Sequence, residues 1–88
     1  MGRVQGEVIV RNTTGLHARP AALFVQIANK FNSAVTLEKE GECVDGKSII
    51  GVLSLGINEG TKVNLLVEGE DANIAFEELK NFLERRDG

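Results

Sequence analysis

The sequence has few of the residues on which cysteine-rich, metal-binding and membrane-spanning proteins depend. Its 88 residues include one cysteine, one histidine and one proline, with no tyrosine or tryptophan. One cysteine cannot form an internal disulfide, and one cysteine with one histidine does not make a metal-ligand set. No apolar run is long enough for a membrane span, and no signal peptide is apparent. We therefore predict a cytoplasmic protein that needs no metal or cofactor, with Cys43 as a small packing residue.

A scarcity of positive charge argues against nucleic-acid binding. The net charge is −3, whereas binding to a phosphate backbone requires a basic face. The charge is nevertheless uneven, because residues 1–33 hold four basic side chains against one acidic side chain, Glu7. Residues 66–88 hold seven acidic side chains against three basic ones. The N-terminal third also contains the only histidine. The net positive charge of residues 1–33 favours an acidic or phosphorylated partner.

The length is sufficient for one domain with one modest core. A domain of 88 residues buries about 60–65% of the surface that its unfolded chain exposes. This leaves little room for a deep substrate cavity. The chain shows no linker, repeat or low-complexity run. We predict one domain over residues 1–88, with any chemistry at its surface.

Hydrophobic patterns divide the chain into seven elements. We predict strands at residues 4–11, 34–38, 42–44 and 62–68. Three helices are predicted: one over residues 18–31, a short one from a Ser48 cap to about residue 54, and a last one after an Asp71 cap. The order β-α-β-β-α-β-α predicts an α+β fold, with one mostly antiparallel sheet and helices on one face.

The only histidine stands at the expected start of the first helix. Pro20 fits only the first turn of a helix, which places His17 at or next to the N-cap. The first N–H groups of a helix lack partners in the chain, so those of Ala18 and Arg19 favour an anion. The Arg19 guanidinium lies close enough in sequence to bind the same oxygens. The same positive field disfavours imidazolium, and a neutral His17 has a lone pair that can attack phosphorus.

An isolated histidine before a helix is more often a solvated turn residue, with a neighbouring arginine as a solvated charge. Here the surrounding octapeptide favours phosphoryl chemistry, because Gly15, Arg19 and Pro20 each have a separate physical reason for their position. A histidine that accepts a phosphoryl group from another protein must have an exposed ring.

The second helix predicts a regulatory site and an apolar surface. Ser48 caps the helix, and phosphate at a helix start is compatible with the fold, so it is also a candidate for regulatory phosphorylation. We expect Val52 and Leu55 to be buried, although core packing is the commoner role for the whole apolar run. The side chains expected to form an exposed partner-binding patch are Leu23, Ile27, Ile49, Ile50 and Leu53.

Three segments resemble parts of one known family. Residues 15–22, Gly-Leu-His-Ala-Arg-Pro-Ala-Ala, resemble the active-site motif of HPr, the histidine-containing phosphocarrier of the bacterial phosphoenolpyruvate:sugar phosphotransferase system. Residues 46–56 resemble the family's second motif, and residues 68–71 its lead into the last helix. The likeness extends over residues 7–83. It implies an open-faced sandwich with strand order 1-4-2-3, with two longer helices and one short helix on one face.

The resemblance also implies a phosphoryl carrier rather than an enzyme with its own turnover. His17 would take a phosphoryl group on Nδ1 from enzyme I, which phosphoenolpyruvate charges, and pass it to sugar-specific IIA domains. Arg19 would clamp the phosphate. Relatives that only regulate lack the histidine, which this chain has. Thr14 stands where some members carry a different polar residue, which leaves its contact with the phosphate open. A carrier that docks on several partners in turn is expected to be a monomer.

Ser48 matches the regulatory serine of the family. The resemblance implies modification by an ATP-dependent HPr kinase/phosphorylase, found mainly in Gram-positive bacteria, and a modified form that is the corepressor of a catabolite regulator. Enteric relatives have the serine without that kinase, so the residue alone does not establish this regulation.

Two other functions remain as alternatives. A regulatory adaptor would bind its partners through phosphorylated Ser48, with His17 in a secondary role. A small-ligand sensor of the βαββαβ kind would instead bind its ligand through Gly-rich loops at a dimer interface.

Overall fold

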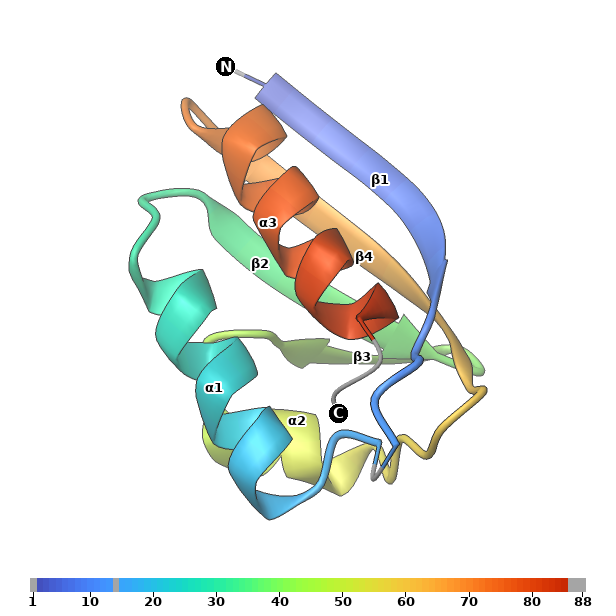
Figure 1. Cartoon of the computed structure of the whole chain (residues 1–88). Coiled ribbons are helices and arrows are strands. Elements are labelled where there is room, and N and C mark those ends of the chain that lie inside the picture. Colours follow the sequence, from blue (N-terminus) through green and yellow to red (C-terminus); the bar gives the residue numbers. More distant parts are fainter. Residues whose placement is uncertain (1, 14, 86–88) are drawn as a thin grey trace.

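Strands and helices follow one another in the predicted order. The computed structural model describes residues 2–13 and 15–85. Its elements are β1 (Gly2–Ile9), α1 (Ala18–Asn29), β2 (Ala34–Lys39), β3 (Glu42–Asp45), α2 (Ile49–Ser54), β4 (Lys62–Gly69) and α3 (Ala72–Glu84) (Figure 1). Each predicted element is therefore present, with small differences at the ends.

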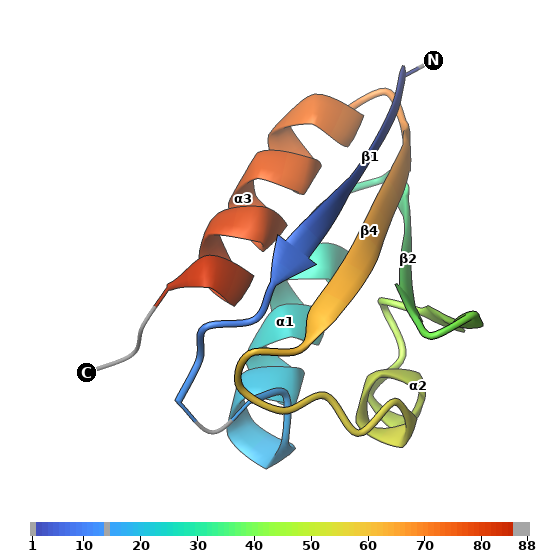
Figure 2. The same ribbon diagram turned by 90° about the vertical axis from the view of Figure 1, so that its right-hand side faces the viewer.

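The four strands form one sheet in the order β1-β4-β2-β3. All three neighbouring pairs are antiparallel, so β1 and β3 are the two edges. Figure 2 shows α1 and α3 on one side of this sheet, and α2 packs against α1 and β3 at the end of the helical layer. The α+β class, the open-faced sandwich and the strand order 1-4-2-3 are confirmed.

The core lies between the sheet and the two long helices. Alternate residues of β4, namely Val63, Leu65 and Val67, are buried against it. The helix stripes face the same layer, with Phe24 of α1 and the half-buried Phe82 of α3 at a ring-centroid distance of 6.5 Å. The other buried residues of the two stripes are Ala21, Ala28, Ala72, Ala75, Phe76, Leu79 and Leu83. The buried residues of each helix therefore recur at the spacing of an amphipathic helix.

The first strand begins and ends two residues earlier than predicted. Val8 and Val10 are both buried, but the β1–β4 pairing ends at Ile9. The Val10 backbone instead bonds to the loop before β4, with its N–H donating to Thr61 O at 2.9 Å and its carbonyl accepting from Gly60 N at 2.7 Å. Alternate side chains therefore stay buried beyond the last β1–β4 pair. The predicted strand was too long at this end because it was based on that alternation.

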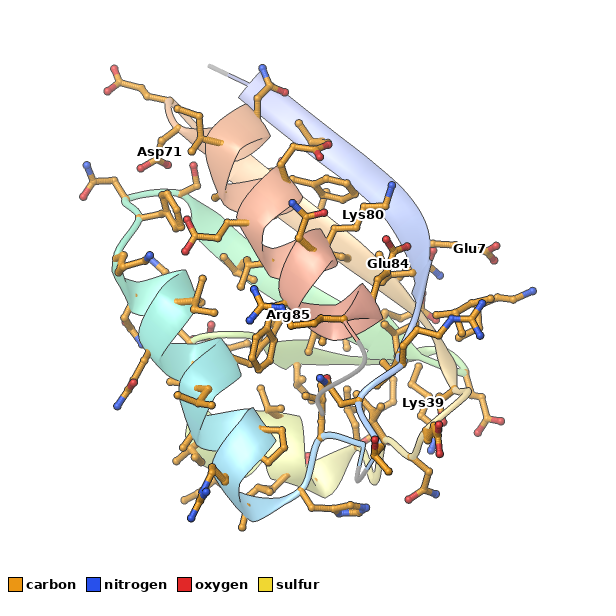
Figure 3. All side chains as sticks on the ribbon, in the orientation of Figure 1. Glu7, Lys39, Asp71, Lys80, Glu84 and Arg85 are labelled. Atoms are coloured by element: carbon orange, nitrogen blue, oxygen red, sulfur yellow. The ribbon has the colours of Figure 1, made fainter. Side chains whose placement is uncertain are left out.

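Asp71 precedes α3 as predicted, but its side chain does not cap that helix. The carboxylate accepts hydrogen bonds from Asn32 N at 2.9 Å, from Ser33 N at 3.0 Å and from the Ser33 hydroxyl. Figure 3 shows Asp71 beside the loop that joins α1 to β2. The Ser33 hydroxyl, with help from the backbone N–H groups, lowers the pKa of Asp71. The Asp71 side chain, predicted to cap α3, thus links the loop before α3 to the loop between α1 and β2.

Cys43 is an exposed free cysteine, so the prediction of a packing residue is wrong. It lies on β3, a strand of four residues at the edge of the sheet, where it pairs with Glu38 of β2. Three of the four β3 side chains are exposed. A short edge strand gives its side chains few neighbours, which explains the exposure.

The loop that leaves β1 is bonded to the C-terminal end of α3. Arg11 N donates to Leu83 O at 2.7 Å. Asn12 is 3% exposed, and its Nδ2 donates to Phe82 O at 3.4 Å and to Arg85 O at 3.1 Å. The last carbonyls of a helix lack the regular helical partner. Phe82 O also accepts from Arg85 N at 3.4 Å, and the Asn12 amide adds a side-chain donor to this end of α3. The loop is fixed here, five residues before His17.

We expect Asn12→Asp to lower the free energy of unfolding by about 3 kcal/mol at neutral pH. The substitution keeps the shape of the side chain but replaces the donating Nδ2 with an oxygen that faces two carbonyls. Urea unfolding measures the loss. Asn81→Asp adds the same charge at an exposed position of α3 and is the matched control. Equal stabilities for the two variants would contradict the bonding described for Asn12.

Candidate functional site

His17 occupies the N-cap of α1 with an exposed side chain. Its backbone is extended, with φ −97° and ψ −164°, and its carbonyl accepts the first helical hydrogen bond from Ala21 N at 2.7 Å. Pro20 lies in the first turn, where no intrahelical donor is required. The predicted helix start is therefore confirmed. The His17 ring makes no hydrogen bond to the N–H groups of its own helix.

The ring contacts a loop that is distant in sequence. His17 Nε2 lies 3.0 Å from Oδ1 of Asn58, 41 residues later and between α2 and β4. Sequence analysis did not identify Asn58 as a site residue. It belongs to an Asn-Glu-Gly turn, a pattern that indicates a change of chain direction but carries no signal for a contact with a histidine.

Backbone contacts hold the two loops together beneath the ring. Leu16 N donates to Ile57 O at 2.9 Å, and both of these side chains are fully buried. Gly15 has a positive φ of 68°, and a Cβ atom there would lie 2.5 Å from Ile57 O. Asn58 N donates to the Thr61 hydroxyl at 3.1 Å. The position of Asn58 relative to His17 is thus set by backbone packing.

The residues after His17 form the first turn of α1. Ala18 and Arg19 are exposed, and their backbone N–H groups belong to the set that has no partner within a helix. Among residues 2–13 and 15–85, no hydrogen bond or ion pair is recorded for the Arg19 guanidinium. The predicted contact between Arg19 and a phosphate stays a prediction. Thr14 lies outside the described residues.

Ser48 is the N-cap of α2, as predicted. Its Oγ accepts from Gly51 N at 3.2 Å, and its carbonyl accepts from Val52 N at 3.0 Å. The side chain is partly exposed. A hydroxyl in this position stabilises the short helix.

Apolar side chains are exposed on α1 and α2, which pack against each other. Ile50 is 77% exposed, Leu23 and Leu53 are each 42% exposed, and Ile49 is 38% exposed. Ile27 differs from the prediction, because it is half-buried and packs against the core. We call these five residues the apolar patch. The predicted burial of Val52 and Leu55 is confirmed.

A metal site and a membrane-spanning helix each place requirements on the described residues. In residues 2–13 and 15–85 there is no group of three or more His, Cys, Asp or Glu side chains placed to bind a metal. None of the helices in this part of the chain is both long and apolar enough to cross a bilayer. A shallow groove of about 560 Å³ lies away from His17, with Glu7, Arg11, Lys62 and Glu84 among its lining residues. Glu7 and Glu84 are labelled in Figure 3.

Comparison with known proteins identifies similar chains across nearly the whole length. The family described as "PTS HPr component phosphorylation site" matches residues 4–85. HPr-like protein Crh of Bacillus subtilis (strain 168) is 53% identical over 81 residues, which cover 92% of this chain and 95% of that protein. The crystal structure of phosphocarrier protein HPr from Bacillus anthracis str. Ames is 44% identical, with a TM-score of 0.91, over 94% of this chain and 99% of that one.

One solved relative is a dimer. A crystal structure of Bacillus subtilis Crh, described as an intertwined dimer with a swapped domain, is 53% identical with a TM-score of 0.76. The match covers 92% of this chain and 93% of that one. Similar chains therefore include a phosphocarrier and a dimeric HPr-like protein.

Proposed function

The chain belongs to the HPr family, and from this premise we propose that it is a phosphocarrier of the sugar phosphotransferase system. In this proposal His17 accepts a phosphoryl group from phospho-enzyme I and passes it to sugar-specific IIA domains in the cytoplasm. The observation that carries the proposal is the exposed His17 ring at the N-cap of α1. A helix start favours an anion, so a phosphoryl group on this ring is stabilised without being enclosed.

The proposed carrier is a co-substrate of other enzymes. The transferred group needs a positioned nucleophile and nearby positive charge, and the first turn of α1 supplies both in a small surface area. In this proposal the N–H groups of Ala18 and Arg19 and the Arg19 guanidinium bind the phosphate oxygens. The groove lined by Glu7 and Glu84 has no part in the transfer, because neither His17 nor Ser48 lines it.

The apolar patch is the proposed docking surface for enzyme I and the IIA domains. It is formed by the two helices whose N-caps are His17 and Ser48, and these helices pack against each other. In this proposal a partner bound to the patch also reaches the ring. Exposed apolar clusters on small proteins commonly mark such contacts. We propose that the working form is a monomer, because several partners must reach one surface in turn.

The test of the carrier function is incubation with enzyme I and phosphoenolpyruvate, followed by intact-mass measurement. The mass is expected to rise by one phosphoryl group, and the adduct is expected to be labile in acid and stable in base. Phosphorus NMR then identifies the residue and the ring nitrogen. An unchanged mass, under conditions in which an HPr of known activity is fully phosphorylated, would refute the proposal.

A second candidate function, regulation through Ser48, is favoured by the position of this residue. Ser48 caps α2 directly before Ile49 and Ile50, the latter being the most exposed member of the apolar patch. A phosphate on Ser48 would place a double negative charge at the edge of that surface. In this candidate role an HPr kinase/phosphorylase adds the phosphate, and the modified form binds a catabolite regulator. The two roles are compatible.

We expect Ser48→Asp to weaken binding to enzyme I by about tenfold, which corresponds to about 1.4 kcal/mol. The new carboxylate borders an apolar contact that must lose its water on docking. The fold is expected to persist, because aspartate also caps helices. Ser48→Ala is the matched control, with a small loss of stability but unchanged affinity. Titration calorimetry measures both variants, and equal affinities for the parent and both variants would reject a regulatory role for Ser48.

A further inference from the structure

The hydrogen bond between His17 and Asn58 decides which ring nitrogen keeps its proton. Oδ1 of Asn58 lies 3.0 Å from Nε2 of His17, and a carboxamide oxygen accepts hydrogen bonds but cannot donate them. In a neutral imidazole only one nitrogen carries a proton. When this hydrogen bond forms, the proton is therefore on Nε2, and the lone pair is on Nδ1.

We propose that Asn58 is a positioning residue that holds His17 in the Nε2–H tautomer and directs the phosphoryl group to Nδ1. The inference rests on the proposed carrier function. In the transfer step the Nδ1 lone pair forms the new N–P bond, while the bond from phosphorus to the donor breaks and its electron pair leaves with the donor. The Nε2 proton stays in place. The ring becomes formally cationic, and the hydrogen bond to Asn58 Oδ1 strengthens as this charge develops.

Asn58 is held in a fixed position, as this role requires. Its N–H donates to the Thr61 hydroxyl at 3.1 Å, and its carbonyl accepts from Thr61 N at 3.0 Å. The preceding residue, Ile57, is fully buried and bonds to Leu16 N at 2.9 Å. The carboxamide therefore projects from a closed turn that is bonded to the chain directly before His17.

The other ring nitrogen has no competing partner in its own helix. The His17 side chain makes no capping hydrogen bond to α1, so the helix does not draw Nδ1 into the role of a cap acceptor. A carboxamide also suits the task better than a carboxylate. An aspartate at this distance would stabilise imidazolium and so remove the lone pair, whereas asparagine orients the ring without adding charge.

The experiment compares Asn58→Ala and Asn58→Asp with the parent protein, and Asn81→Ala is the control. Nitrogen-15 NMR of the unphosphorylated protein reports the His17 tautomer, and intact mass with phosphorus NMR reports the rate and the nitrogen of phosphorylation. We expect the parent and Asn81→Ala to carry Nε2–H and to form the Nδ1 adduct. Asn58→Ala is expected to populate both tautomers and to accept the phosphoryl group about tenfold more slowly. Asn58→Asp keeps Nε2–H, but its ring remains cationic to a higher pH than in the parent.

Two results would overturn the inference. One is an Nδ1–H tautomer in the parent, which would mean that the Asn58 amide donates to the ring. The other is a tautomer and rate in Asn58→Ala equal to those of the parent. The tautomer measurement needs no enzyme I, so failure of the carrier function appears separately, as a parent protein that gains no phosphoryl group.

Discussion

Replacement of His17 with alanine is expected to abolish phosphoryl uptake and to leave the fold intact. His17 is the only histidine of the chain, and its ring is exposed, with Asn58 as its recorded hydrogen-bond partner. Truncation therefore removes no buried side chain, and we expect the free energy of unfolding to change by less than about 0.5 kcal/mol. Uptake from phospho-enzyme I is expected to fall by at least about a thousandfold, because the sequence contains no second imidazole that could accept the group. Intact mass and urea unfolding measure the two effects.

His17→Gln is the matched control for this variant. Glutamine keeps a polar side chain at the N-cap but has no nitrogen lone pair comparable to that of imidazole. It should be as inactive as alanine, which separates loss of the nucleophile from loss of side-chain volume. An acid-labile phosphoryl group on His17→Ala, formed at the parent's rate, would show that another residue is the acceptor.

The sequence predicted well those features that are decided within a few neighbouring residues. Pro20 lacks an N–H group and fits only a first helical turn, so the start of α1 follows from one residue. Ser48 finds its partner, Gly51 N, three residues away, and the cap of α2 was predicted for the same reason. The exposure of Ile50 follows from the narrow inner face of a helix of six residues.

Features that depend on distant contacts were not predicted from local pattern. Asn58 reaches His17 across 41 residues, and Asp71 bonds to Ser33 across 38 residues. In both cases the residue type suits several partners, and only the folded chain selects one. Asp71 shows this directly, because a carboxylate before a helix is satisfied equally well by its own helix or by N–H groups of a neighbouring loop.

The strand order also depends on contacts between residues that are distant in the sequence. Alternating residues identify the strands, but the pairing of β1 with β4 joins segments at opposite ends of the chain. The family resemblance supplied the order 1-4-2-3, and the hydrophobic pattern alone did not. Cys43 is a related case, since its exposure depends on β3 being an edge strand.

Replacement of Gly15 with alanine is expected to lower the free energy of unfolding by about 3 kcal/mol and to displace His17 from Asn58. Gly15 has φ +68°, which costs a residue with a Cβ atom about 1 kcal/mol. The added Cβ would also lie 2.5 Å from Ile57 O and 2.7 Å from Asn58 Cα. Both are backbone atoms, so relief requires the two loops to separate. Urea unfolding measures the stability, and the amide shifts of Leu16 and Asn58 report the separation.

Gly56→Ala distinguishes the contact from the backbone conformation. Gly56 has φ +61°, close to the value at Gly15, but nothing lies within 4 Å of a Cβ atom built there. It should therefore lose only about 1 kcal/mol, and it should keep its rate of phosphoryl uptake. The remaining loss in Gly15→Ala then measures how tightly the turn before His17 is pressed against the turn that carries Asn58. If the two variants were equally stable, left-handed backbone strain alone would explain the glycine at position 15, and the close approach of the two loops would not be a requirement of the site.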